Sequence, residues 1–260
     1  MPMIDADGCP IHVEVEGPDN APALMLSNSL GTNLTMWDPQ AKAFAEKFRL
    51  IRYDRRGHGQ SGAPKGPYSM ERLGRDALAV LDALKIRKTS WCGLSMGGMV
   101  GQWLGANAPE RMDRIILSNT ACYYADKDFW AGRVRLLRDK GLGAIVGPTM
   151  ERWFSKAFRD RAPQTAASMS EILLKTPLEG YIGCCEAIAA MDHREALTKI
   201  KAPVLVIAGK VDPATTVEDA EFIHGRIAGS KLAIIDAAHI SNVEAPDIYT
   251  KTALDFLTAR

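Results

Sequence analysis

The sequence predicts an α/β fold in which a mostly parallel central sheet carries helices on both faces and is interrupted by a helical insertion. Two observations predict the sheet and its helices: short apolar runs end at turn residues, and they alternate with stretches of helical periodicity. A third observation predicts the insertion. Over residues 123–192 the β-branched runs disappear and helical stretches follow one another.

The elements of the first region follow from local signals. Apolar runs between turn residues predict strands at 11–15, 23–26, 48–53, 89–94 and 114–118. A first helix is expected at 37–47 and another at 96–106. A clearer helix follows Ser69, a residue type that caps helices, and its apolar positions recur at helical spacing over 70–84.

The inserted region should contain helices at 130–140 and 150–158, after which the β-α order resumes. Strands are expected at 203–208 and 232–236, and helices at 217–227 and 246–257. We therefore expect a core of residues 1–122 and 193–260, with residues 123–192 as a helical cap that lies over one edge of the sheet as a lid.

Composition excludes several classes of partner. The 260 residues carry a net charge of +1, which gives no electrostatic reason to expect nucleic acid or a membrane surface as partner. The N-terminal sequence lacks the pattern of a signal peptide, and no window holds 18 apolar residues, so a soluble, cytoplasmic protein is expected. Five scattered cysteines suggest reduced thiols, and none has zinc-site spacing. The oligomeric state is not indicated.

Residues 57–62 read GHGQSG and match the dinucleotide-binding pattern G-x-G-x-x-G. That pattern holds a pyrophosphate only if its glycines open a helix. Here Pro64 and Pro67 follow within a few residues, which disfavours a helix. A tight loop is the favoured interpretation.

Residues 93–97 read GLSMG and match G-x-S-x-G. The motif lies between an apolar strand and a helical stretch, the setting in which a strained turn exposes a nucleophilic serine at the carboxyl edge of a sheet. The plainer alternative is that Ser95 only caps the following helix. Gly93 and Gly97 favour the nucleophile, because they let neighbouring segments approach closely, and capping then follows from the same position.

A serine nucleophile requires a base and an orienting acid. Of the five histidines, His239 is the best placed, because it follows the strand at 232–236; the other four are expected to be structural or solvated. The acid should leave a strand between serine and histidine in the chain, and Asp212 does so. Asp236 is a rival, and Asp212 followed by Pro213 could instead cap a helix.

Such a reaction also needs donors for an oxyanion. One should be the backbone N–H of Met96, which follows the nucleophile. The other should come from the polar, glycine-containing loop after the strand at 23–26, where we choose the N–H of Leu30.

These segments together resemble the α/β-hydrolase superfamily over nearly the whole chain. The motifs that carry the resemblance are GLSMGG at 93–98, DRRGHGQS at 54–61, GKVD at 209–212 and AH at 238–239. The resemblance is strongest to the 3-oxoadipate enol-lactonases, through SNSLGT at 27–32, MWDPQ at 36–40, RWF at 152–154, GY at 180–181 and HISNVE at 239–244.

That resemblance implies hydrolysis of a small enol-lactone in the catabolism of aromatic compounds by the β-ketoadipate route, without a metal or organic cofactor. The chain departs from the family pattern at His193 and around Cys184 and Cys185, where the substrate prediction is weakened. An enol-lactone of this class carries a free carboxylate. Trp130 and Arg133 on one helix face, with Trp153 as an apolar wall, are the residues we expect to bind it.

Alternatives remain open at this point. Arg133 could be a solvated helix residue and both tryptophans could be packing residues of the cap. A general carboxylesterase, or a hydrolase that splits a carbon-carbon bond of a ring-cleavage product, would use the same serine, acid and histidine. An aspartate nucleophile is disfavoured, because position 95 is serine. From another class, the fold could serve as a small-ligand receptor.

Overall fold

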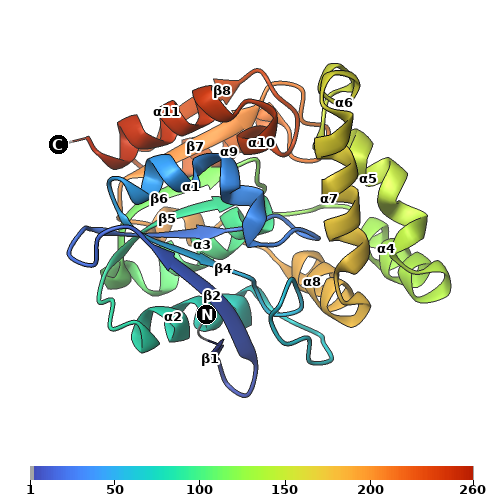
Figure 1. Ribbon diagram of the computed structural model, residues 1–260, viewed down its shortest axis with the longest axis horizontal. Helices are drawn as coiled ribbons and strands as arrows, with labels where there is room; N and C mark the ends of the chain where they lie inside the picture. Colours follow the sequence, from blue (N-terminus) through green and yellow to red (C-terminus); the bar gives the residue numbers. More distant parts are fainter. Residues whose placement is uncertain (1–2, 260) are drawn as a thin grey trace.

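The computed structural model describes residues 3–259, in which eight strands form a single sheet (Figure 1). The strand order is β1-β2-β4-β3-β5-β6-β7-β8. The first two pairings, β1 with β2 and β2 with β4, are antiparallel, and all the others are parallel. The bounds are β1 Met3–Asp5, β2 Pro10–Glu16, β3 Ala23–Ser27, β4 Arg49–Tyr53, β5 Thr89–Leu94, β6 Met112–Ser118, β7 Val204–Gly209 and β8 Lys231–Ile235. The predicted fold class is confirmed.

Helices cover both faces of the sheet. On one face α1 packs against α11 (Figure 1). On the other face α2 packs against α3, α3 contacts the 3-10 helix η4, and η4 contacts α9. Strands β5 and β7 are buried along their whole length between these layers, which explains their unbroken apolar sequences. The bounds are η1 Leu34–Trp37, α1 Asp38–Ala45, α2 Met70–Ala83, α3 Met96–Asn107, η2 Pro109–Arg111, η4 Ala196–Lys199, α9 Val217–Arg226, α10 Ser241–Glu244 and α11 Pro246–Leu257.

The helices between β6 and β7 lie together beside one end of the sheet (Figure 1). Their bounds are α4 Lys127–Lys140, η3 Leu142–Ile145, α5 Val146–Trp153, α6 Lys156–Arg161, α7 Pro163–Lys175 and α8 Leu178–Ala190. At their base, Tyr123 and Asp192 form an isolated antiparallel bridge, and the His193 N–H donates to the Cys122 carbonyl oxygen at 2.8 Å. These contacts join the two ends of the insertion, in agreement with the predicted cap at 123–192, although that division stays a prediction.

Two differences from the predicted elements have physical reasons. The expected helix at 150–158 is wrong, because Phe154 is extended (φ −133°, ψ 140°) and separates α5 from α6. The Ser155 side chain accepts from the Phe158 N–H and begins a new helix there. Strand β1 was not predicted, since only three residues form it; it pairs with β2 in a tight hairpin through residues 6–9.

The loop predicted at residues 57–62 is confirmed, since α2 begins only at Met70. In the part of the chain that the structure describes, no helix is long and apolar enough to cross a membrane.

Candidate active site

Ser95 occupies the tight turn between β5 and α3, with the left-handed backbone conformation φ 57°, ψ −117°. Its N–H donates to the Ser118 carbonyl oxygen at 2.8 Å, which ties the turn to β6. A Cβ at Gly93 would lie 2.1 Å from the Gly97 carbonyl oxygen, and a Cβ at Gly97 would lie 2.1 Å from the Ser27 carbonyl oxygen. Glycine is therefore required at both positions for the turn to close.

The side chain of Ser95 does not cap α3. Ser95 holds the N-cap position, but its hydroxyl makes no capping hydrogen bond, so the expectation that capping accompanies the turn is wrong for the side chain. The positive end of the helix lies beside a hydroxyl that is not used by the backbone. The hydroxyl faces a cavity of about 220 Å³ instead.

His239 and Asp212 lie together at the same edge of the sheet. His239 Nδ1 is 2.8 Å from Asp212 Oδ2, so this nitrogen carries the proton and donates to the carboxylate. His239 lines the cavity with Ser95, and Asp212 is buried behind it. Within the described chain no hydrogen bond joins the Ser95 hydroxyl to His239; such bonds often tighten only when substrate binds.

Asp212 is held as a carboxylate by its neighbours. Burial disfavours its charge, but His239 and the donors Asn119 and Thr215 outweigh that effect and hold the pKa of the Asp212 carboxyl below its ordinary value. Asn119 Nδ2 donates at 3.0 Å and Thr215 Oγ1 at 2.7 Å. Asp212 does not cap α9, because Thr216 does so through a capping box.

Asn119 was missed by sequence reasoning, although it directly follows β6 and so lies at the same edge as Ser95. It adopts φ 44° and also accepts from the Ser241 hydroxyl at 2.6 Å. A polar residue directly after a buried strand was the available signal. The rival acid Asp236 is exposed to solvent and lies outside the cavity lining.

The loop after β3 approaches the serine turn closely. The Gly97 N–H donates to the Asn28 carbonyl oxygen at 3.0 Å, which holds residues 28–30 beside Ser95. Leu30 lines the cavity, and Met96 is the first residue of α3. Over residues 3–259, neither the Leu30 nor the Met96 backbone N–H donates a hydrogen bond. Both donors predicted for the oxyanion are thus available.

The three residues predicted to bind substrate, Trp130, Arg133 and Trp153, all line the same cavity. The cap supplies most of the lining, and loops at the edge of the sheet together with Met99 of α3 supply the rest. The other lining residues are Ser29, Leu30, Ser95, Met99, Tyr124, Phe129, Thr149, Arg152, Tyr181, Ile188, Pro213, Ala214 and His239. Sequence reasoning missed Arg152 and Tyr181 as lining residues, although both lie in segments that carry the family resemblance.

The cavity is positively charged on its cap side. Arg133 donates to the Tyr181 hydroxyl at 2.6 Å, and burial raises the pKa of Tyr181 to about 12, so this hydroxyl stays neutral. Burial and the charge of Arg133 both lower the pKa of Arg152. Among the described residues, neither arginine has a carboxylate partner, and no aspartate or glutamate lines the cavity.

Two further donors on this side lack acceptors. Arg133 Nε and Trp130 Nε1 are buried, and neither has a hydrogen-bond partner between residues 3 and 259. An unsatisfied buried donor costs about 1–3 kcal/mol. An anion bound between these groups would satisfy them.

The positions that depart from the family pattern do not line the cavity. Cys184 and Cys185 are buried in α8, and His193 contacts Gln102 Oε1 at 3.2 Å through Nδ1. The remaining histidines also have partners outside the cavity: His12 contacts Asp54, His58 accepts from Gly31, and His224 contacts Ser230.

This sheet order, with a serine on a strand-to-helix turn and an acid and a histidine at the same edge, is that of an α/β hydrolase. The profile of the alpha/beta hydrolase fold matches residues 22–246, and the chain belongs to this family.

Within this family, the chain is similar to several enol-lactonases. The chain is 45% identical to 3-oxoadipate enol-lactonase 2 of Acinetobacter baylyi, over 90% of this chain and 87% of that protein. It is 40% identical to 3-oxoadipate enol-lactonase 1 of the same organism, over 98% and 96%. Its fold superposes on the crystal structure of the enol-lactonase from Burkholderia xenovorans LB400 with a TM-score of 0.98 at 42% identity, covering 99% of this chain and 100% of that one.

Proposed function

We propose that this protein is a serine hydrolase that opens an enol-lactone ring, and that its substrate is 3-oxoadipate enol-lactone, converted to 3-oxoadipate in the catabolism of aromatic compounds. The observation that carries the proposal is the two-sided cavity. Ser95 and His239 lie on one side, and on the other lie two arginines that have no carboxylate partner among residues 3–259. The sequence identity to 3-oxoadipate enol-lactonases supports the same substrate.

In the proposed mechanism His239 takes the proton of the Ser95 hydroxyl as Ser95 Oγ attacks the lactone carbonyl. Asp212 accepts from His239 Nδ1 and stabilises the imidazolium that forms. The N–H groups of Leu30 and Met96 donate to the oxyanion. The leaving group is an enolate oxygen, a weak base, so ring opening needs little acid catalysis.

The second half of the reaction returns the enzyme to its starting state. The ring-opened enolate, which is still part of the acyl group on Ser95, takes up at carbon the proton that His239 removed from Ser95; it becomes the ketone and leaves His239 neutral. Water, deprotonated by His239, then attacks the acyl-Ser95 ester, and collapse of the second tetrahedral intermediate returns the proton to Ser95. No redox step is involved, since the net reaction adds one water molecule across the ester bond.

Substrate binding in this proposal uses the cap side of the cavity. The free carboxylate of the lactone accepts from Arg133, with Arg152 and Trp130 Nε1 as further donors and Trp153 as an apolar wall. We also propose that the enzyme acts in the cytoplasm. The alternative function that the test must distinguish from an enol-lactonase is a general carboxylesterase.

The test compares a carboxylate-bearing enol-lactone with a neutral enol-lactone of the same ring, each followed by loss of enol-lactone absorbance. A hydrogen bond to a charged group contributes about 1.5–3 kcal/mol, so Arg133→Met should raise KM for the anionic lactone by about 10- to 100-fold. Turnover of the neutral lactone should change little. Arg135→Met, an exposed arginine on the same helix, is the matched control and should behave as wild type.

Two outcomes would count against the proposal. If Arg133→Met and Arg135→Met have equal KM values for the anionic lactone, the carboxylate does not bind at Arg133. If the wild-type enzyme hydrolyses simple esters but leaves the anionic lactone unchanged, the chain is a general carboxylesterase.

A further inference from the structure

The loop of residues 54–60 supports the segment of residues 27–34, which we term the oxyanion loop because it contains Leu30. Hydrogen bonds join the two at three points. The Gly31 N–H donates to His58 Nε2 at 2.9 Å, and the Leu34 N–H donates to Asp54 Oδ1 at 2.8 Å. Arg55 Nη2 donates to the Asn28 carbonyl oxygen. The bonds at Asn28 and Gly31 flank Leu30 on both sides.

His58 can perform this role only as a neutral imidazole. An N–H group donates to Nε2 only if that nitrogen is unprotonated, and the other ring nitrogen, Nδ1, lies 3.4 Å from the Arg56 carbonyl oxygen, where it can donate. The ring is completely buried. Burial and the charge of Arg55 lower the pKa of His58 to about 3, so His58 remains an acceptor near neutral pH.

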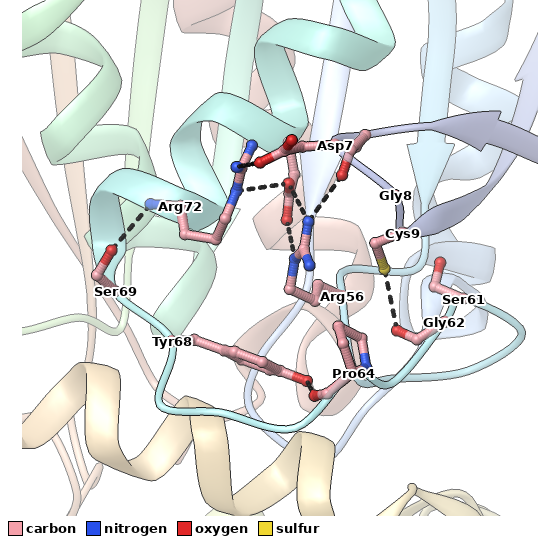
Figure 2. A network of polar contacts seen from close by, with 12 residues as sticks. Asp7, Gly8, Cys9, Arg56, Ser61, Gly62, Pro64, Tyr68, Ser69 and Arg72 are labelled. Atoms are coloured by element: carbon pink, nitrogen blue, oxygen red, sulfur yellow. Dashed lines mark hydrogen bonds and ion pairs between the residues drawn. The ribbon is translucent and has the colours of Figure 1, made fainter.

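Further hydrogen bonds fix the loop that carries His58 to the rest of the core. Arg56 lies in the network of polar contacts in Figure 2, and its Nε and Nη2 donate to the Asp76 carboxylate at 2.7 Å and 2.8 Å. Arg56 also donates to the Ala6 carbonyl oxygen at 2.8 Å, and the Gly57 N–H donates to the Gly62 carbonyl oxygen at 2.8 Å. The acceptor presented to Gly31 therefore belongs to a fixed part of the fold.

His58 also contacts the cap side of the cavity. Its ring stacks on Tyr181, with centroids 6.4 Å apart and an interplanar angle of 28°. Gly31 packs against the same ring, because a Cβ added there would lie 2.9 Å from Tyr181 Cε2. Tyr181 accepts from Arg133, so one aromatic side chain is shared by the oxyanion loop and the cap side of the cavity.

We propose that His58 is a positioning residue that fixes the oxyanion loop: by accepting from Gly31 it holds the preceding N–H of Leu30 towards the cavity before substrate arrives. This inference rests on the proposed hydrolysis. A donor contributes most when its orientation is set in advance, and removal of one oxyanion donor typically costs about 10²- to 10³-fold in kcat. Loss of the His58 acceptor misplaces the donor without removing it, so a smaller loss is expected.

The test uses His58→Phe, which keeps an aromatic ring beside Tyr181 but removes the acceptor, and His58→Gln, whose side-chain oxygen restores one. We expect His58→Phe to lower kcat by about 10-fold or more while KM changes less than about threefold. Affinity for a boronic acid that forms a tetrahedral adduct should fall in the same proportion as kcat. His58→Gln should recover most of both losses.

The control is His193→Phe, which also removes a buried histidine but lies at the base of the cap, away from the oxyanion loop; its kcat should match wild type. His58→Leu is a second variant without an acceptor, for use if His58→Phe does not fold. The proposal is overturned if a folded acceptor-free variant keeps wild-type kcat, if the loss appears in KM alone, or if His58→Gln is as impaired as His58→Phe. Failure of the hydrolase proposal is separate, because it would appear as wild-type protein without lactone turnover.

Discussion

Asp212 accepts five hydrogen bonds, from His239, Asn119, the Ala214 N–H, and the N–H and hydroxyl of Thr215. His239 is the candidate base. The other donors fix the Asp212 carboxylate, so that His239 can donate to it in only one orientation. Four of the five donors lie outside the G-x-S-x-G, acid and histidine pattern. The orientation of His239 is thus set by residues that a motif search does not include.

Replacement of Asp212 by asparagine should impair catalysis strongly. The asparagine amide favours the histidine tautomer in which His239 Nδ1 carries no proton, so Nε2 cannot accept the serine proton. The same change in another serine hydrolase lowers kcat by about 10⁴-fold. We therefore expect lactone turnover to fall by roughly three to four orders of magnitude. Asp236→Asn is the matched control, because Asp236 is exposed at the end of β8 and should be neutral. Equal kcat values for the two variants would contradict the assignment.

The same variant gives a stability test with a defined sign. Because the pKa of Asp212 is below 3.8 in the folded chain, its ionisation contributes stability that is present above the unfolded pKa and lost as pH falls through the folded pKa. Asparagine does not titrate. The difference in unfolding free energy between wild type and Asp212→Asn should therefore narrow below about pH 4 in urea titrations, and a constant difference down to pH 3 would contradict the lowered pKa.

At the residue scale, the sequence predicted which side chains lie close together where a residue's chemistry and its place in the chain agree. Ser95, Asp212 and His239 each follow a strand of the sheet, and parallel strands end at one edge, so their proximity could be predicted. Arg152 could not be selected in this way. Its position on the cavity wall depends on the break at Phe154, which turns α5 relative to α6 and which helical periodicity alone does not indicate.

At the scale of elements, Glu244 joins the cap to the loop that carries His239. Its carboxylate accepts from the Ala238 N–H and from the Ser155 N–H, each at 3.1 Å, and from the Ser155 hydroxyl. Beside it, the Ile240 N–H donates to the Trp153 carbonyl oxygen at 3.0 Å. The segment that carries Arg152 and Trp153 is therefore fixed to the same loop as His239.

Removal of this carboxylate should destabilise the protein. Glu244→Ala leaves three donors without their acceptor: the buried Ala238 N–H and the half-buried N–H and hydroxyl of Ser155. An unsatisfied buried donor costs about 1–3 kcal/mol, so we expect a loss of about 2 kcal/mol in the free energy of unfolding, measured by urea denaturation. Glu71→Ala removes only an exposed ion pair with Arg75 and should change stability by less than about 1 kcal/mol. Similar values for the two variants would show that Glu244 does not join the elements.

Elements were predictable where one periodicity dominates, as in α2 and the fully buried β5. The junction of α5 and α6 escaped prediction because a partner distant in the chain determines it: Glu244 binds Ser155 at the start of α6. Strand β1 escaped prediction because only three residues form it, although its partner β2 follows directly in the chain. Local sequence carries no signal for the contact between Glu244 and Ser155, whereas Asp7 and Gly8, both at positive φ, form the turn between β1 and β2 and were an available hairpin signal.

At the scale of the whole molecule, the parallel sheet supplies one wall of the cavity and the cap supplies the other. The carboxyl edge of the sheet brings together Ser95, His239 and the oxyanion loop, and the cap adds Arg133 and Arg152. In the proposed function, catalysis and substrate recognition are therefore divided between two parts of the fold. This division explains why the motifs of the core predict a reaction, while the substrate prediction depends on the cap and on the similarity to enol-lactonases.

The central claim is that Ser95 is the nucleophile, and covalent labelling tests it most directly. Wild-type protein treated with a fluorophosphonate probe should be modified on the peptide that contains Ser95, as located by mass spectrometry, and lactone turnover should fall in parallel with labelling. Ser95→Ala should remain unlabelled and lose several orders of magnitude in kcat. Labelling at another residue, or near-normal lactone turnover by Ser95→Ala, would contradict the account.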